Sequence, residues 1–166
     1  ISILLLSLSL LIFSGCDFLD SLIDLSPETT PISTVSGTVK VHFIDVGQAD
    51  AIFIDYGDID ILIDGGNNSD GDLVVNYLKS LNTDDIELIV ATHPHEDHIG
   101  GLDVVISNFN VDKVIKPDLS ENTKTNKDLE IAISEKNILV ENPEQGSILE
   151  YDDLKFTVLS DKNKDY

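Results

Sequence analysis

The sequence is poor in sulfur and in positive charge. It contains no methionine, and Cys16 is its only cysteine. An intrachain disulfide is therefore excluded, and so is a metal site built on several thiolates. Ten basic residues stand against 31 acidic ones, which gives a formal net charge of −21. A surface of that sign repels polyanions, so nucleic acid is disfavoured as a partner, although a bound metal ion would reverse the sign locally. A salty habitat would explain the acidic surface equally well.

The beginning of the chain lacks charge altogether. No charged residue precedes Asp17, no basic residue precedes Lys40, and residues 1–13 are all apolar or serine. Small residues then lead to Cys16, as in a bacterial lipoprotein signal, whose cysteine becomes the lipid-bearing first residue of the mature protein. We expect an extracytoplasmic, membrane-anchored lipoprotein whose true start lies upstream. Two alternatives stay open, because spanning a bilayer takes about 20 residues: an uncleaved anchor lengthened by upstream residues, or a segment of a soluble core.

The remaining composition predicts a linker and one domain. Serine, threonine, proline and acidic residues dominate after Cys16, which predicts a flexible linker over residues 17–37. Hydrophobic residues make up 42% of the chain, enough for one domain with a sizeable core, which we place at residues 38–166. Residues 1–16 form the signal segment.

Hydrophobic periodicity predicts a mixed α/β domain. Strands are expected at residues 39–44, 51–54, 59–63, 87–91, 111–115, 138–140, 147–150 and 154–159, with a hairpin turn at 56–58. Helices are expected at residues 73–81, 102–109 and around 129–133. Strands first, and then helices alternating with strands, fit half of an α/β sandwich. The periodicity alone establishes only that α and β elements are mixed.

Six consecutive residues, His93-Pro94-His95-Glu96-Asp97-His98, contain three of the four histidines. They follow a buried strand, where α/β proteins commonly keep their chemistry. Imidazole and carboxylate are ligands that suit zinc and similar divalent ions. His93 and His95 can turn the same way toward one ion, and Asp97 and His98 can address a second ion about 3.5–4 Å away. The pattern predicts two divalent ions, zinc or manganese. The alternative is a polar turn in which Asp97 or His98 caps a helix.

Other polar residues are predicted to have lesser roles. Glu96 falls outside the ligand spacing, so we expect it to face solvent, with support of a ligand as the alternative. His42 lies far along the chain from the other histidines and is predicted to be structural or at the surface. Asp45, Gln48 and Asp50 either form a turn or line a pocket. Solvated turns are predicted at Asn67-Asn68, Asp84-Asp85 and Asp152-Asp153.

Three segments resemble one known family. The run from Thr92 to Gly101 resembles the signature loop of the metallo-β-lactamase superfamily of dinuclear metallohydrolases. The run from Phe43 to Ala51 resembles the opening motif of the ComEC/Rec2 competence-protein branch, except that Ala49 stands where that branch has glycine. If that turn needs a positive φ, alanine is disfavoured there. The run from Ile61 to Gly66 resembles the strand end that backs the metal loop. The match covers about residues 38–160, in the right order and spacing.

The resemblance implies a fold, a site and a reaction. The fold is an αβ/βα sandwich, of which mainly the N-terminal half is present. The implied metal ligands are His93, His95, Asp97 and His98, with a catalytic role for Asp97 as well. In this family, Asp64 holds the loop from beneath by hydrogen bonds; the alternative is that it only begins a turn. A metal-bound hydroxide would attack a phosphoester, with an amide or lactone as the alternative bond.

The resemblance also implies missing parts. The family needs a later histidine, a bridging aspartate and a final histidine, whereas no histidine follows His98. We therefore expect a fragment with no hydrolase activity of its own. Its expected partners are membrane lipid, through Cys16, and a small-molecule or phosphodiester substrate. The alternative to a hydrolase is a non-catalytic surface lipoprotein that uses the fold as a binding module.

Overall fold

The computed structural model describes residues 37–118, 121–151 and 153–159. All of them belong to one compact unit. The predicted signal segment with Cys16, the linker up to residue 36, and Asp152 lie outside the described residues. The expectations for those parts of the chain, and for the domain boundaries, stay predictions.

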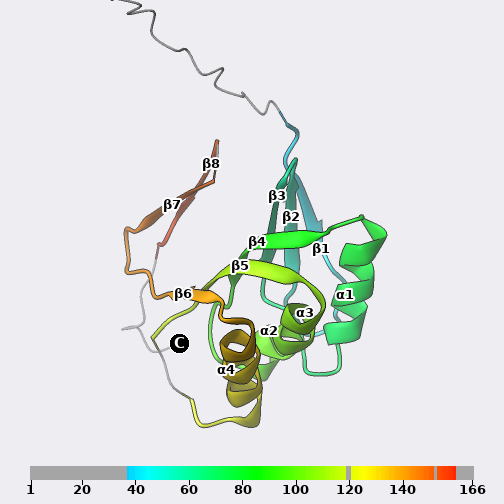
Figure 1. Ribbon diagram of the computed structural model, residues 1–166, viewed down its shortest axis with the longest axis vertical. Coiled ribbons are helices and arrows are strands. Elements are labelled where there is room, and N and C mark those ends of the chain that lie inside the picture. The colour runs from blue at the N-terminus through cyan, green and yellow to red at the C-terminus, as the bar shows by residue number, and fades with distance from the viewer. Residues whose placement is uncertain (1–36, 119–120, 152, 160–166) are drawn as a thin grey trace, which may run out of the picture. The chain divides into compact units, whose positions relative to one another are not determined.

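A six-stranded sheet forms the centre of the fold (Figure 1). In their order across the sheet, the strands are β1 (Lys40–Phe43), β2 (Ile52–Tyr56), β3 (Ile59–Ile63), β4 (Asp85–Val90), β5 (Asn110–Ile115) and β6 (Leu139–Glu141). The first three strands are antiparallel neighbours, and the strands from β3 to β6 run parallel. In β4, Leu88 and Ile89 point to opposite faces and are both fully buried. Burial on both faces is typical of parallel strands.

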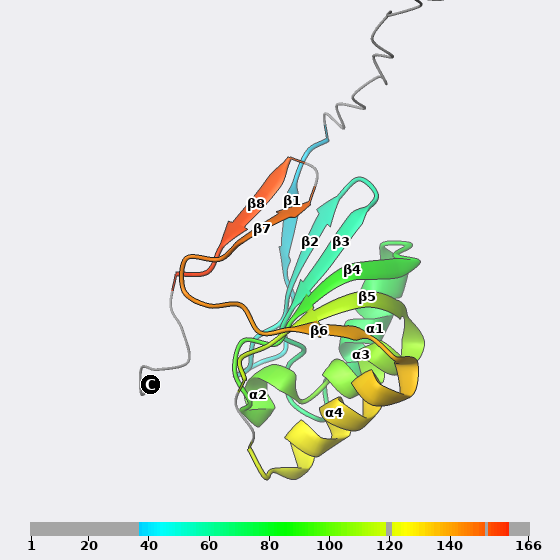
Figure 2. The same ribbon diagram turned by 60° about the vertical axis from the view of Figure 1, so that its left-hand side comes forward.

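Helices cover one face of this sheet (Figure 2). They are α1 (Gly71–Ser80), α2 (Glu96–Ile99), α3 (Leu102–Asn108) and α4 (Lys124–Lys136). α1 packs against α3, and α3 packs against α4. Val74 and Leu78, one turn apart on α1, are fully buried in the same core as Phe53 and Leu62 of the sheet. The helical spacing of apolar residues therefore places the larger core between the helices and the sheet.

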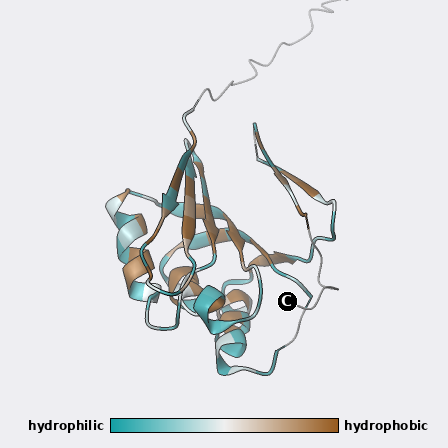
Figure 3. Ribbon diagram, turned by 180° about the vertical axis from the view of Figure 1, so that it is seen from behind, coloured by the Kyte–Doolittle hydropathy of each residue, from teal (hydrophilic) through white to brown (hydrophobic). Residues whose placement is uncertain are grey.

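A two-stranded hairpin packs against the other face of the sheet. It consists of β7 (Ile148–Tyr151) and β8 (Leu154–Thr157). Its half-buried apolar side chains pack against a second core that includes Ile61, Leu88 and Ile115. In Figure 3, much of the strand ribbon carries the brown colour of hydrophobic residues. The hairpin covers only part of this face, because Val41 and Phe43 of the edge strand β1 remain 50% and 78% exposed.

The observed fold is the predicted mixed α/β fold, with a few differences in its elements. The strand predicted at 59–63 coincides with β3, but α4 begins at Lys124, several residues before the predicted apolar segment. Thr123 explains the early start: its hydroxyl accepts a hydrogen bond from the backbone N–H of Asn126, which caps the helix. Asp85, predicted to lie in a turn, is the first residue of β4. Within the described residues, no helix has both the length and the apolar character needed to cross a bilayer.

Candidate metal centre

The histidine-rich loop lies at the carboxyl-terminal edge of the parallel strands. β4 ends at Val90, and the loop then turns into the short helix α2, whose N-cap is His95. Asp97 and His98 lie inside this helical turn rather than capping it. The short helix was not among the predicted elements, because four residues are too few to show a helical hydrophobic period.

The fold brings the four predicted ligands together. The ring of His93 lies 3.8 Å from that of His98 and 4.7 Å from that of His95, measured between ring centroids. The Oδ2 atom of Asp97 lies 3.7 Å from Nε2 of His98. These donor types suit zinc or manganese, but no three His, Cys, Asp or Glu side chains in the described part of the chain surround a common point at metal distances. The set fits a divalent ion in its chemistry, and the ligand assignment stays a prediction.

The environment of His93 favours its neutral form. Burial lowers the pKa of this imidazole, and the neighbouring rings of His98 and His95 lower it further. Neutral imidazole is the form in which histidine binds a metal ion. The clustering of the rings therefore favours the protonation state that a metal site requires.

Asp64 forms the floor of the loop. It directly follows β3, is only 3% exposed, and has a φ of 57°, in the left-handed region. Its Oδ1 accepts the backbone N–H of Thr92 at 2.9 Å, and its Oδ2 lies 2.6 Å from the Thr92 hydroxyl and 2.9 Å from Nδ1 of His98. Each of these hydrogen bonds joins the end of β3 to the loop after β4. Asp64 is thus bonded to the loop as the family pattern implies, and its support of a bound metal stays a prediction.

Backbone hydrogen bonds attach a third segment to the loop. The N–H of Asp50 donates to the carbonyl of Asp97 at 3.0 Å, and its own carbonyl accepts from Gly66 at 2.8 Å. The Gly65 N–H donates to the carbonyl of His98 at 2.7 Å. The Asp50 carboxylate is mostly exposed, with its Oδ2 3.6 Å from Nδ1 of His98. The predicted turn-or-pocket residue Asp50 therefore contributes its backbone to the loop and its side chain to the rim of the site.

The remaining part of this segment is a turn. The Asp45 carboxylate accepts the N–H of Gly47 at 3.3 Å, and Gly47 has a φ of +70°. Gln48 is exposed. Ala49 is not among the residues with positive φ, so the turn does not require glycine there. The residue of this turn with a positive φ is Gly47, two residues before Ala49. Alanine in place of the glycine of the branch motif therefore causes no backbone strain.

Two residues to which the sequence analysis gave no role in the site, Thr92 and Asn68, make contacts around the loop. Thr92 lies between Asp64 and His93, since its hydroxyl is also 3.1 Å from Nδ1 of His93. Asn68, predicted to lie in a solvated turn, donates from its side chain to the hydroxyl of Thr125 at 3.2 Å, and its N–H donates to Glu96. Asn68 lies in an exposed turn, as predicted, and its side chain also links this turn after β3 to α4. A threonine directly before the first histidine was the only available signal for Thr92.

Glu96 and His42 lie apart from the ring cluster. Glu96 is exposed, as predicted, although its carboxylate accepts the N–H of Asn68. His42 places its Nδ1 2.9 Å from the hydroxyl of Tyr77 on α1, and its ring packs on Phe53. It is a partly buried structural contact between β1 and α1, consistent with the prediction.

A small pocket opens next to the loop. It measures about 210 Å³ including the space open to solvent, and both His93 and Pro94 line it. The other lining residues include Lys116 and Asn126. The ammonium of Lys116 lies 2.8 Å from the Glu130 carboxylate. In a strongly acidic chain, this places one lysine in the wall of a pocket shared with the histidine loop.

Comparison with known proteins identifies the family. The sequence model of the Metallo-beta-lactamase superfamily matches residues 44–161, more than half of the chain. The chain belongs to the metallo-β-lactamase superfamily. It is 24% identical over 149 residues to ComE operon protein 3 of Bacillus subtilis, covering 79% of this chain and 19% of that protein. Together with the motif around Asp45, this similarity places the chain with the ComEC-like branch.

Solved structures show the same fold. A metallo-β-lactamase from Cronobacter sakazakii with a HARLDQ motif superposes with a TM-score of 0.55 and 15% identity, covering 72% of this chain and 49% of that one. MEM-A1, a subclass B3 metallo-β-lactamase from a soil metagenome library, gives a TM-score of 0.53 and 18% identity, covering 70% and 48%. The chain thus spans about half the length of these structures and about a fifth of the curated relative. At these identities the likeness establishes the fold alone.

Proposed function

We propose that this chain forms part of a metal-dependent hydrolase that binds two divalent ions, zinc or manganese, at His93, His95, Asp97 and His98. The observation that supports this most directly is the attachment of the clustered histidine rings to the buried Asp64 carboxylate. A polar turn without function would not need a buried acid that orients an imidazole. Carboxylate–histidine pairs of this kind are typical of metal sites.

The proposed chemistry divides between metal and protein. When bound, the divalent ions would act as Lewis acids and lower the pKa of a coordinated water. The histidine rings would bind the ions. Asp97, whose side chain is half exposed next to His98, would accept a hydrogen bond from the attacking water and orient it. Asp64 keeps His98 from rotating. The bond cleaved is a phosphoester, with an ester, amide or lactone as the alternative.

The substrate is proposed to be small and anionic. Lys116 in the pocket wall pairs with Glu130, and we propose that a phosphate group binds beside this lysine. The net charge of −21 opposes the approach of a long polyanion, so a small phosphodiester is favoured over nucleic acid.

The location is proposed from the sequence around Cys16. A lipidated Cys16 would hold the protein at the outer face of the cytoplasmic membrane, and stable anchoring takes two acyl chains or a second membrane signal. The protein expressed from its full-length gene should incorporate labelled lipid and partition into detergent, and Cys16→Ser should abolish both. Undiminished labelling of the Cys16→Ser variant would refute the anchor.

Metal analysis tests the proposed site. Protein purified from zinc- or manganese-supplemented medium should contain metal, and His95→Ala should lower the metal content several-fold, because the site loses a direct ligand. His42→Ala is the matched control, since that histidine contacts Tyr77 of α1 and Phe53 of β2, away from the loop. Equal losses in both variants, or a metal content near zero in the unmodified protein, would contradict the proposal.

A further inference from the structure

Thr92 lies at the centre of a chain of hydrogen bonds that runs through the site. Its hydroxyl oxygen is 2.6 Å from Oδ2 of Asp64 and 3.1 Å from Nδ1 of His93. The same Oδ2 atom is 2.9 Å from Nδ1 of His98. Two of the four predicted ligands are thus connected, directly or through one hydroxyl, to a single buried oxygen.

The direction of these hydrogen bonds follows from the groups that form them. A carboxylate has no proton to donate, so Oδ2 of Asp64 accepts from both of its neighbours. The hydroxyl of Thr92 has one hydrogen, and that hydrogen points at Asp64. Its oxygen can then only accept at its other contact, so the donor there is the Nδ1–H of His93. By the same reasoning, His98 also carries its hydrogen on Nδ1.

The opposite arrangement is unfavourable. If Thr92 donated to His93 instead, its oxygen and Oδ2 of Asp64 would face each other at 2.6 Å with no hydrogen between them. Two oxygen lone pairs at that separation repel each other, and the buried carboxylate would lose a charge-assisted hydrogen bond. The short distance therefore selects one direction for the whole chain of bonds.

We propose that Thr92 is a positioning residue that fixes neutral His93 in the tautomer with hydrogen on Nδ1 and a free lone pair on Nε2. Which ring nitrogen of a histidine can bind a metal is set by the hydrogen bond of the other nitrogen. Asp64 fixes the tautomer of His98 by a direct hydrogen bond. Thr92, which is itself bonded to Asp64, fixes the tautomer of His93. The consequence for metal affinity rests on the proposed function; the tautomer does not.

Nuclear magnetic resonance of the histidine rings tests the tautomer without any metal. In the metal-free chain labelled with 15N-histidine, long-range proton–nitrogen spectra at a pH where His93 is neutral should show hydrogen on Nδ1 of both His93 and His98. In Thr92→Val, which keeps the shape but lacks the hydroxyl, His93 should populate the other tautomer, while His98 keeps its own through Asp64. Thr92→Ser should restore the original spectrum.

Metal affinity provides the second measurement. By competition with a chelator, Thr92→Val should bind zinc about 10-fold more weakly, as expected for loss of a group that orients a ligand, and Thr92→Ser should bind as the unmodified chain does. A spectrum of the unmodified chain with hydrogen on Nε2 of His93 would overturn the proposal even if no variant folds. So would an unchanged His93 spectrum in a folded Thr92→Val variant. If the spectra behave as expected but zinc does not bind, the tautomer assignment stands and the proposed function fails.

Discussion

The two edges of the central sheet use carboxylates in opposite ways. At the carboxyl-terminal edge, Asp64 is buried and surrounded by donors: the N–H and hydroxyl of Thr92 and a ring nitrogen of His98. At the amino-terminal edge, Asp60 is the second residue of β3, the strand that Asp64 follows, and other acids lie near it. Asp60 and Asp64 are four positions apart in the sequence, yet Asp64 accepts three hydrogen bonds whereas Asp60 lies near other negative charges.

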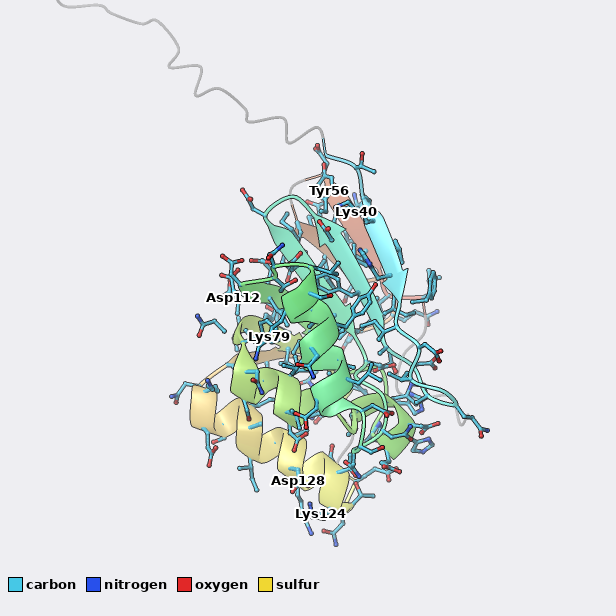
Figure 4. The ribbon with its side chains drawn as sticks, turned by 90° about the vertical axis from the view of Figure 1, so that its right-hand side faces the viewer. Lys40, Tyr56, Lys79, Asp112, Lys124 and Asp128 are labelled. Atoms are coloured by element: carbon cyan, nitrogen blue, oxygen red, sulfur yellow. The ribbon has the colours of Figure 1, made fainter. Side chains whose placement is uncertain are left out.

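The amino-terminal edge is therefore a site of electrostatic strain. Asp60 lies opposite Asp55 in the sheet, and its N–H donates to the Glu87 carboxylate at 2.6 Å. Partial burial raises the pKa of Asp60 to about 6, and repulsion from Asp55 and Glu87 adds to the rise, although a hydrogen bond with Thr83 opposes it. Burial raises the pKa of Glu87 as well. Lys40, labelled with Tyr56 at this edge in Figure 4, lies 2.7 Å from Asp55 and offsets part of the repulsion.

The difference shows that residue type alone does not reveal a site. Both edges are acidic in sequence, and both aspartates are mostly or partly buried. Only the carboxyl-terminal edge surrounds its acid with donors that connect it to imidazoles. Functional carboxylates are distinguished by their partners, and the partners come from the loop that the parallel strands bring alongside.

The largest expected effect is on the packing of the carboxyl-terminal edge. A Cβ on Gly101 would lie 2.3 Å from the carbonyl oxygen of Gly65 and 2.9 Å from Cα of Gly71. These are backbone atoms that cannot move aside, so Gly101→Ala should lower the free energy of unfolding by about 3 kcal/mol or more. Urea unfolding measures the change.

Gly47→Ala is the control for that substitution. Gly47 has a φ of +70° but open space where a Cβ would stand, whereas Gly101 has an ordinary φ of −91°. The control should cost only about 1–2 kcal/mol, from backbone conformation alone. A smaller loss in Gly101→Ala than in Gly47→Ala would show that the two backbones at this edge are not in contact.

The next largest effect is expected for Asp64→Asn, which is later compared with the same substitution at Asp60. Asp64→Asn should lower the free energy of unfolding by about 2 kcal/mol and weaken metal binding roughly 10–100-fold. An asparagine side chain has only one accepting oxygen, so its NH2 group would face a donor of Thr92 or His98 and at least one hydrogen bond would be lost. Asparagine tolerates the left-handed φ, so backbone strain is not the cause. Chemical unfolding and chelator competition provide the two measurements. If Asp64→Asn were as stable as the unmodified chain, the distinction between the edges would disappear.

The smallest expected effect is that of Asp60→Asn, which should raise the free energy of unfolding rather than lower it. Because its pKa is raised from 3.8 to about 6, Asp60 binds a proton more strongly in the folded state than in the unfolded state. Stability from this group is fully present below pH 3.8 and is lost as the pH rises to about 6. Asp60→Asn should therefore raise the free energy of unfolding at pH 7 by about 1 kcal/mol, a value reduced for solvent screening of a partly exposed group.

The pH dependence sharpens that test. Asp60→Asn should also flatten the fall in stability between pH 4 and pH 6, the window set by the raised pKa. The exposed turn residue provides the control: Asp58→Asn should change stability by less than about 0.5 kcal/mol at any of these pH values. A destabilised Asp60→Asn variant at pH 7 would mean that Asp60 is satisfied in the way Asp64 is.

Sequence patterns predicted the elements well where hydrophobic residues define them. β3 coincides with its prediction because Ile59, Ile61 and Ile63 alternate across a sheet with apolar cover. The first turns of α4 were missed because its start is polar and is determined by the cap at Thr123. α2 was missed because its four residues are too few to show a helical hydrophobic period.

The sequence located the histidine loop but not the contacts that hold it in place, and the assignment of its side chains as metal ligands stays a prediction. The spacing of His93, His95 and Asp97 identified the loop directly. The role of Thr92 depends on distances to Asp64 and His93 that no spacing rule contains. The link from Asn68 to Thr125 joins residues 57 positions apart, and only the folded chain brings them together.

The contact between the turn after β3 and the loop also bears on how fast a metal ion could enter and leave. The Gly65 N–H is bonded to the carbonyl of His98, and no side chain separates Gly65 from Gly101. Two backbones in direct contact leave the loop little freedom to open. Ligand exchange would then depend on rotation of His95 and Asp97, the two predicted ligands that Asp64 and Thr92 do not hold, which takes about picoseconds to nanoseconds in exposed residues, whereas loop opening takes up to about microseconds. The glycines at this edge would make the backbone of the site rigid and leave fast motion to the side chains of His95 and Asp97.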